Sequence, residues 1–391
     1  MTARHTMALV FALGVVTPFA ARAVDFNLAG TLQVDYLFTP FSRSDPRPAR
    51  STLDGFTNEL SLKLAIDINR HTSANVKACF GCHGFEVGMA YVDLRVADEL
   101  NLRFGRFSPT FGEFGLRHDP GNHRLSDKPL PYDMGRMLRM LDWDRSVLPM
   151  PYVDNGIEIS GTHFFGNRVQ LDYAAHVVAG LRANTETPYE VDWTSMRTAA
   201  PYYIDNNSQP SFGGRLGITT RVADRVDLTV GGSAMYGAYD NRARMSYLVL
   251  GADLYLRLRR TNVRAEYLVR RTDMYGGEQS RFEYAVLPDA NGALPERVFQ
   301  VRDGWYIEVE QPVSRTVDLI LRWDGMRRWG NTAPGSPLDF SAGVSRWTLG
   351  TQWSVFRGYR IKASAQHYQW WGLRNGNAQD WAFHLGAVAT F

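Results

Sequence analysis

Residues 60–69 read LSLKLAIDIN, and the alternation in this stretch indicates the fold class. Every second residue from Leu60 to Ile68 is apolar, and the residues between them include Lys63 and Asp67. Successive side chains of a β-strand point to opposite faces, so the stretch predicts a strand with one apolar and one charged face. The same alternation recurs in residues 248–259, 316–323 and 359–366.

The alternation continues along the chain and predicts sixteen strands, many of them about twice as long as the ordinary strand of ~5–6 residues. A soluble β-sandwich also alternates. Long strands whose polar face is charged and whose other face is nearly uncharged are instead typical of a transmembrane antiparallel β-barrel. The strands are expected near residues 27–37, 58–69, 75–80, 85–96, 100–107, 155–164, 167–179, 212–222, 225–238, 245–258, 261–273, 300–312, 315–326, 342–354, 358–371 and 380–391.

The connections between these strands alternate in length. Those after even-numbered strands are short, as are 81–84 and 239–244, and short turns at the periplasmic end with long outer loops are the rule for outer-membrane barrels. An even strand count places both termini at the short-turn end, and a closed sheet over residues 24–391 leaves no unpaired edge in lipid. The long connections are 38–57, 108–154, 180–211, 274–299, 327–341 and 372–379.

The N-terminal residues 1–23 read MTARHTMALVFALGVVTPFAARA. A polar start, an apolar stretch and an A-x-A site before Val24 predict a secretory signal peptide. Beyond it no apolar run reaches the ~18–20 residues of a transmembrane helix. A net charge of +3 excludes a strongly basic nucleic-acid-binding protein.

Two consecutive segments carry a family resemblance. Residues 86–95 read EVGMAYVDLR and residues 99–113 read ELNLRFGRFSPTFGE. Together they resemble the corresponding strand, turn and strand of phosphate-selective-type porins, which lead into the long third loop. The resemblance implies a sixteen-stranded barrel in the outer membrane of a Gram-negative bacterium, often a homotrimer, with the third loop folded into the lumen. Phosphate selectivity is not implied, because the chain has no dense ladder of Arg and Lys.

Segment 108–154 is too long for an ordinary connection and is therefore expected to be functional. We expect it to form a constriction inside the barrel, where facing rows of opposite charge would govern which solutes pass. A solvated surface loop is the alternative. Residues 134–140 could form a short helix with three methionines on one side. The candidate cations of the segment include Arg117, Arg124, Lys128, Arg136, Arg139 and Arg145.

The charged faces of the strands provide further candidate pore-lining residues. The predicted cations are Lys63, Arg257, Arg264, Arg322, Arg360 and Lys362, and the predicted anions are Asp67, Asp172, Asp253, Glu266, Glu308 and Asp318. These charges nearly cancel, so we expect at most weak ion selectivity. The leading hypothesis is a passive diffusion channel for small hydrophilic solutes or ions. An adhesin or structural anchor is disfavoured by the charged lumen face.

The only two cysteines lie in the motif Cys79-Phe-Gly-Cys82-His83. C-x-x-C-H is the attachment motif of c-type haem, in which the histidine becomes an axial iron ligand. A hairpin-tip disulfide is the first alternative, since an exported chain meets oxidising conditions. A reduced pair with an incidental histidine is the second. Zinc is disfavoured because no second cysteine pair exists to complete a tetrahedral site.

A haem at this hairpin would suggest a second function, electron transfer at or across the outer membrane. One haem cannot bridge a hydrocarbon layer of ~30 Å, so a cytochrome partner would be needed. The chain contains no G-x-S-x-G, H-E-x-x-H or P-loop motif, so we do not expect an enzyme. Candidates for the sixth iron ligand are Met134, Met137, Met140, His118 and His123.

Overall fold

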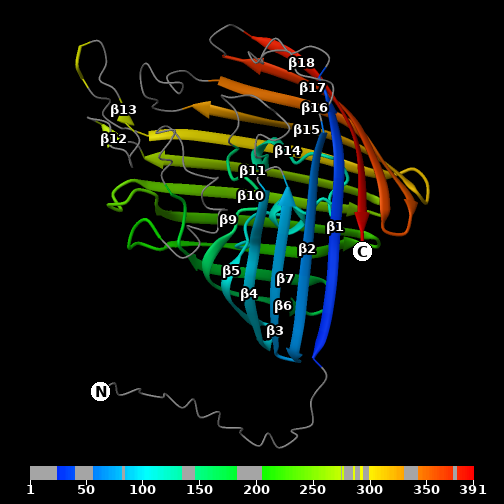
Figure 1. Ribbon diagram of the computed structural model, residues 1–391, viewed down its shortest axis with the longest axis horizontal. Helices are drawn as coiled ribbons and strands as arrows, with labels where there is room; N and C mark the ends of the chain where they lie inside the picture. The colour runs from blue at the N-terminus through cyan, green and yellow to red at the C-terminus, as the bar shows by residue number, and fades with distance from the viewer. Residues whose placement is uncertain are drawn as a thin grey trace, which may run out of the picture.

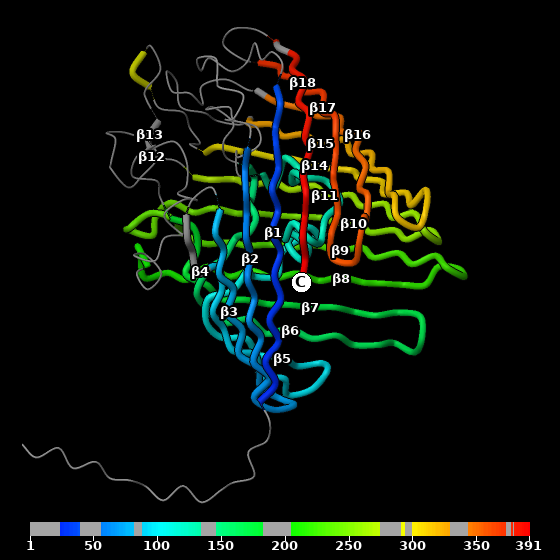
Figure 2. The backbone as a smooth tube through the Cα atoms, turned by 45° about the vertical axis from the view of Figure 1, so that its right-hand side comes forward, coloured from blue at the N-terminus to red at the C-terminus, as the bar shows by residue number. Residues whose placement is uncertain are grey.

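The structure is a computed structural model in which sixteen antiparallel strands form a closed barrel (Figures 1 and 2). The first strand, β1, pairs with the last, β18, and the register from Thr31↔Thr390 to Phe38↔Phe383 closes the sheet. The described residues are 24–39, 56–81, 84–133, 146–182, 205–273, 275–276, 285–286, 291–293, 299–329, 342–372 and 377–391.

Each barrel strand corresponds to one that the alternation predicts, with boundaries that differ by a few residues. The strands are β1 (Asp25–Phe38), β2 (Phe56–Asn69), β3 (Thr72–Gly81), β4 (Gly84–Ala97), β5 (Leu100–Phe107), β6 (Asp154–Phe165), β7 (Val169–Val178), β8 (Ser211–Ala223), β9 (Val226–Ala238), β10 (Ser246–Leu258), β11 (Thr261–Asp273), β14 (Phe299–Pro312), β15 (Val317–Trp329), β16 (Ala342–Phe356), β17 (Tyr359–Trp371) and β18 (Ala378–Thr390). A small parallel pair outside the barrel, β12 (Tyr275–Gly276) with β13 (Ala285–Val286), was not predicted.

The two faces of the barrel wall differ as the alternation requires. On β15, Leu319 and Leu321 are 44% and 47% exposed on the outside, whereas Ile320 and Arg322 on the inside are each 1% exposed. Similar outward-facing apolar residues occur on the other strands and form an apolar belt. All backbone groups within a closed barrel can pair between strands, so such a belt can lie in lipid.

Aromatic side chains form a row across this outer surface. Trp323, Trp347, His367 and Trp381 occupy directly paired positions on β15 to β18. The ring centroids of Trp323 and Trp347 are 5.8 Å apart. Such a row is typical of the aromatic girdle of an outer-membrane barrel. Trp370 is not part of it, because its side chain faces inward and is buried.

The turns at one end of the barrel are short. They comprise residues 70–71, 98–99, 166–168, 224–225, 259–260, 313–316 and 357–358. Gly358 has a φ of +79°, a left-handed conformation that glycine adopts without steric cost. Both β1 and β18 have their terminal ends at this short-turn end, as predicted. Within the described ranges, no helix is long and apolar enough to cross a bilayer.

Residues 108–153, between β5 and β6, are named the lumen loop. Their described parts, 108–133 and 146–153, contain two short 3-10 helices, η1 (Phe114–Arg117) and η2 (Leu130–Tyr132). These described parts lie inside the barrel, where Figures 1 and 2 show them between the strands. They form hydrogen bonds with inward-facing side chains of β1, β9, β11 and β14 to β17.

Candidate functional site

The beginning of the lumen loop is held by a carboxylate on β11. Glu266 accepts hydrogen bonds from the backbone N–H groups of Glu113, at 3.1 Å, and Phe114, at 3.2 Å. It also accepts a hydrogen bond from the Tyr132 hydroxyl. Gly112 lies so close that an added Cβ would be 2.0 Å from a Glu266 oxygen. The lumen loop and the barrel wall are therefore in direct contact at this position.

Ion pairs extend this contact across β11 and β14. Glu113 of the loop lies 3.0 Å from Arg117 and 3.1 Å from Arg264 of β11. Arg117 also lies 3.2 Å from Glu308, and Arg264 lies 2.7 Å from Glu310. Positive and negative groups alternate throughout, which offsets the cost of removing each charge from water.

A second ionic cluster joins the loop to β15 and β16. Asp127 of the loop pairs with Arg322, at 2.7 Å, and with Arg346. Asp324 lies 3.2 Å from Arg322 and accepts a hydrogen bond from Arg346 Nε at 2.9 Å. All four side chains are buried. Removal of one member would leave the buried cluster with unbalanced charge, which is more destabilising than the loss of a surface pair.

On β17, two cations bind carbonyl groups of the loop instead of carboxylates. Lys362 Nζ donates hydrogen bonds to the carbonyl oxygens of Pro120, His123 and Leu125, at 2.8, 2.9 and 3.0 Å. Arg360 donates one to the carbonyl oxygen of Gly121. A single ammonium group has three donors, so Lys362 satisfies three otherwise orphaned buried acceptors.

Apolar side chains fill the remaining space between the loop and this part of the barrel. One buried cluster combines loop residues such as Phe111 and Met150 with Val249 and Leu268 of the wall. Another combines Leu130 of η2 with residues of β1 and β15 to β18. Strands β9 to β11, β14 to β18 and β1, whose inward faces the loop occupies, are named the covered wall.

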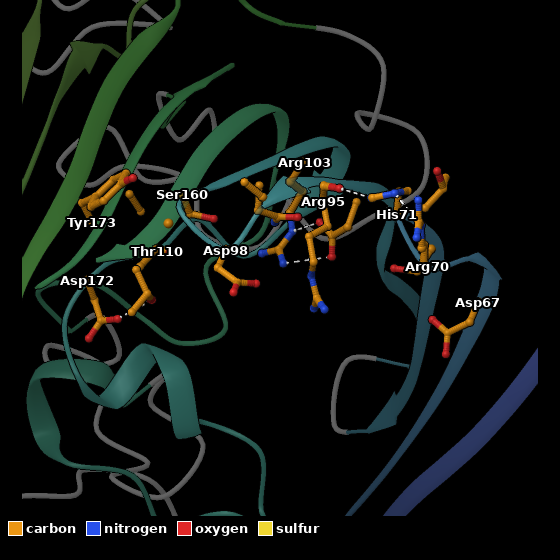
Figure 3. A pocket seen from close by; sticks show the side chains of 18 of the residues that line it. Asp67, Arg70, His71, Arg95, Asp98, Arg103, Thr110, Ser160, Asp172 and Tyr173 are labelled. Atoms are coloured by element: carbon orange, nitrogen blue, oxygen red, sulfur yellow. Dashed lines mark hydrogen bonds and ion pairs between the residues drawn. The ribbon is translucent and has the colours of Figure 1, made fainter. Parts of the chain in front are cut away.

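Strands β2 to β8 have a different environment and are named the open wall. A cavity of about 1450 Å³ lies along them at the short-turn end. Thr110 and Leu116 of the lumen loop form part of its lining. Figure 3 shows charged and hydroxyl side chains from several strands and short turns around this space, with Asp98, Arg103, Ser160 and Asp172 among them.

Most charges around the cavity have a partner of opposite sign or a polar neighbour. Arg103 Nε donates a hydrogen bond of 2.8 Å to Asp93, and Arg103 Nη1 lies 3.4 Å from Glu158. Asp172 accepts hydrogen bonds from the Thr162 hydroxyl at 2.6 Å and the Gln170 amide at 2.8 Å. The lining thus carries both signs of charge and many neutral polar groups, which suits hydrated solutes of either charge.

Burial perturbs two histidines of the lumen loop. Burial lowers the pKa of His118 to about 4, although the neighbouring Asp119 acts in the opposite direction. Burial also lowers the pKa of His123 well below its usual range. Both imidazoles are therefore neutral at pH 7. The pKa of Asp127 is lowered despite its burial, because Arg322 and Arg346 stabilise the carboxylate.

The structure places the predicted pore-lining residues in three groups. Lys63 and Asp67 are exposed on the inner side of the open wall, and Asp67 lines the cavity. Arg257 lies near the short-turn end, paired with Asp227, and Arg124 lies 3.6 Å from Asp318. The third group does not line the cavity. Arg117 belongs to the lumen loop and pairs with Glu113 and Glu308, and the strand residues Arg264, Arg322, Arg360 and Lys362 lie against that loop.

The third group corrects the sequence-based interpretation. The inward orientation of its four strand residues was inferred correctly from alternation, but exposure to the lumen does not follow from it. Arg322 and Lys362 are each 1% exposed, because the loop packs over them. Arg136 and Arg139 lie outside the described residues.

Of the cysteine motif, the structure describes Cys79, which lies near the end of β3. Cys79 faces inward and is buried, with its Sγ 3.9 Å from the Ser61 hydroxyl oxygen. Cys82 and His83 lie outside the described residues, as do Met134, Met137 and Met140. His118 Nε2 is 3.4 Å from Lys77 Nζ on β3, and His123 is buried near β17. Of the two, only His118 therefore contacts the strand that carries the motif.

Several site residues were missed by the analysis of sequence. Arg346 and Asp324 bind the loop, and Arg103 lines the cavity. Alternation could have assigned all three to the inner face. It could not have separated the two that contact the loop from the one that lines the cavity, because that difference depends on contacts between distant parts of the chain.

Comparison with known proteins supports the fold. No protein-family model matches the chain, and no curated protein matches it by sequence. Among solved structures, it is similar to OmpF of Salmonella typhi, solved with daunomycin, at 10% identity and a TM-score of 0.56, covering 94% of this chain and 97% of that one. It is similar to an anion-selective porin from Comamonas acidovorans at 11% identity and a TM-score of 0.52, covering 94% and 100%.

A third similar structure is the trimer form of OmpT, an outer-membrane protein of Vibrio cholerae. It has 10% identity and a TM-score of 0.50, and the match covers 94% of this chain and 100% of that one. The shared feature is the closed barrel. The chain therefore has the fold of outer-membrane porins, and its apolar belt places the barrel wall in the membrane.

Proposed function

We propose that the protein is an outer-membrane porin through which small hydrophilic solutes or ions diffuse passively. The cavity of about 1450 Å³ along the open wall carries this proposal. Its lining includes many polar and charged side chains, and the lumen loop occupies the opposite part of the interior. Solutes would therefore pass between the open wall and the loop, along one side of the barrel.

Both signs of charge line this route. Asp67, Asp93 and Asp172 lie with Arg95 and Arg103 around one space. Fixed charges of opposite sign largely cancel at a distance beyond the Debye length of ~8–10 Å. Weak ion selectivity is the expected behaviour, and the proposal assigns no particular solute.

Conductance of the purified full chain in planar lipid bilayers tests the proposal. Ser160 lines the cavity, so Ser160→Trp should lower the single-channel conductance several-fold by filling part of the route. Ser345 lies on the outer face, where its hydroxyl contacts Gln369, so Ser345→Trp is a matched control that should leave conductance unchanged. Absence of conductance from a folded barrel, or equal effects of both substitutions, would contradict the proposal.

The proposal includes a constriction formed by the lumen loop. Deletion of residues 120–150 should raise conductance, provided that the barrel still assembles. Heat-modifiable migration in gel electrophoresis reports assembly independently of conductance. Unchanged conductance in an assembled deletion variant would show that the loop does not limit the route.

We also propose that the protein forms homotrimers, as the similar OmpT does in its trimer form. Light scattering coupled to size-exclusion chromatography in mild detergent measures the mass of the protein without its detergent. A mass of three chains would support the trimer, and a mass of one chain would contradict it.

A covalent c-type haem remains the alternative proposal for Cys79, Cys82 and His83. The contact between Lys77, two residues before Cys79 on the same face, and His118 favours it, because a candidate sixth ligand lies nearby. The burial of Cys79 against Ser61 weighs against it. Expression with cytochrome c maturation machinery, followed by a haem stain and a visible spectrum, tests whether the chain carries covalently bound haem. Cys79→Ala should abolish any signal.

A further inference from the structure

A second cavity, separate from the solute route, lies at the short-turn end between two neighbouring hairpins. Its volume is about 480 Å³. The turn at residues 224–225 joins β8 to β9, and the turn at residues 259–260 joins β10 to β11. The cavity is lined by Arg225, Arg257, Leu258, Arg259, Arg260, Thr261 and Gln311, and is named the arginine pocket.

The two turns that form the arginine pocket are fixed to each other. The backbone N–H of Arg259 donates a hydrogen bond of 2.9 Å to the carbonyl oxygen of Arg225. Both residues have left-handed backbones, with φ of 56° and 61°. Non-glycine residues rarely adopt this region, because the Cβ atom comes too close to the following carbonyl oxygen. Arginine at both positions, where glycine or asparagine would be unstrained, indicates a role for the side chains.

The charge of the pocket is strongly positive. Asp227 pairs with Arg257, and Asp224 lies 4.0 Å from Arg225, with both members of that second pair highly exposed. Across the described parts of the chain, neither Arg259 nor Arg260 forms an ion pair with an acidic side chain. Four arginines thus line one concave space that has fewer carboxylates than cations beside it. Planar guanidinium groups bind phosphate through paired hydrogen bonds.

The position of the pocket indicates where such a phosphate would come from. Leu258 faces outward, is 39% exposed and belongs to the apolar belt. Thr261 pairs with Leu258 across the hairpin and therefore shares its outward face. The pocket accordingly lies where the belt meets the turns, which is the depth of lipid headgroups in the leaflet on this side.

We propose that the arginine pocket binds the phosphate headgroup of an anionic glycerophospholipid, with the acyl chains against the apolar belt beside Leu258. The guanidinium groups of Arg259 and Arg260 would contact the phosphate, and the hydrogen bond between the turns would hold them in place. The proposal requires the barrel to lie in a membrane but does not depend on solute passage.

Native mass spectrometry of the full chain, released from detergent with phosphatidylglycerol, tests the proposal. The double variant Arg259→Gln/Arg260→Gln should bind this lipid at least roughly tenfold more weakly, which is the loss expected for one or two charge-assisted contacts. Arg315 and Arg357 lie in other short turns, so Arg315→Gln/Arg357→Gln removes the same number of positive charges from the short-turn end of the barrel. This control should bind as the unmodified chain does.

The source of the phosphate is tested with two further probes. Phosphatidylcholine has no net charge and should bind much more weakly than phosphatidylglycerol. Inorganic phosphate should not displace the lipid at matched concentration, because it gains nothing from the apolar belt. If both double variants lost phosphatidylglycerol binding equally, the binding would be due to general electrostatic attraction and not to the arginine pocket. Equal binding of inorganic phosphate would reassign the pocket to a free anion, and either result would overturn the proposal.

Discussion

Lys362 on the covered wall and Lys63 on the open wall are both inward-facing lysines of the same barrel. Lys362 is fully enclosed by three loop carbonyls, whereas Lys63 is exposed on the inner surface. The ionic partners differ in the same way, since Arg322 is buried in a cluster with Asp127 while Arg103 lines the cavity. Inward charges therefore serve two purposes in this protein, attachment of the loop and lining of the route.

The contrast between the walls is not complete. Asp119 of the lumen loop pairs with Lys77 of β3, and the backbone N–H of Thr110 donates a hydrogen bond of 2.7 Å to Glu158 of β6. These contacts hold the loop at the boundary of the cavity. The loop thus has a defined position relative to both walls, which a constriction of fixed size requires.

The largest expected effect is the loss of Asp127. Asp127→Ala would remove one of the two carboxylates that Arg322 and Arg346 share and leave these buried guanidinium groups with Asp324 alone in common, at a cost of up to about 3–5 kcal/mol to loop attachment. We expect faster proteolysis of the loop and larger, less uniform conductance, with the barrel still heat-modifiable. Asp67→Ala on the open wall is the control and should not change proteolysis. Equal protection of the loop in both variants would remove the distinction between the walls.

The next largest effect is expected from replacing Lys362 or Lys63 by methionine, which has a similar length and no charge. Lys362→Met would leave buried carbonyls of residues 120, 123 and 125 unsatisfied and weaken loop attachment by about 1–3 kcal/mol. Lys63→Met should leave attachment unchanged and make the channel more cation-selective. Proteolysis rates and reversal potentials measure the two effects separately. A change in loop protection with Lys63→Met would contradict this assignment.

An acidic pH should weaken attachment of the lumen loop through His118, which contacts Lys77 of β3. The pKa of His118 is about 4 in the folded protein, below its ordinary value of about 6.5. The unfolded or detached loop therefore binds more protons between these values, so attachment weakens as pH falls from about 6.5 to about 4. Proteolysis of the loop across this range measures the effect. His118→Gln should flatten the profile, and an unchanged profile in this variant would exclude His118 as its cause.

The smallest expected effect concerns the charges of the open wall. Asp67→Asn and Asp172→Asn together should shift the reversal potential in a salt gradient toward anion selectivity by a modest amount, because cations of the route would lose two counter-charges. Low ionic strength should enlarge the shift, since screening is weaker there. Loop protection should remain constant. A shift of the opposite sign would show that these carboxylates do not face the solute route.

Alternation along the chain, of the kind seen in residues 60–69 and 316–323, predicted the strands and the face to which their charged residues point, and the lengths of the connections favoured the barrel. Alternation is a local property, because successive side chains of any strand lie on opposite faces. The outward orientation of Leu319 and Leu321 and the inward orientation of Arg322 follow from it without knowledge of any partner.

The division of the interior into a covered and an open wall could not be obtained in this way. Asp127 and Arg322 are 195 positions apart, and Lys362 and Pro120 are 242 apart, so no local pattern relates them. Arg103 and Arg322 have the same residue type on the same face of their strands. Only the closed barrel and the course of the loop inside it determine that one lines a cavity and the other is buried in an ion cluster. Desolvation and pairing act between groups that folding brings together, whereas strand alternation acts along the chain.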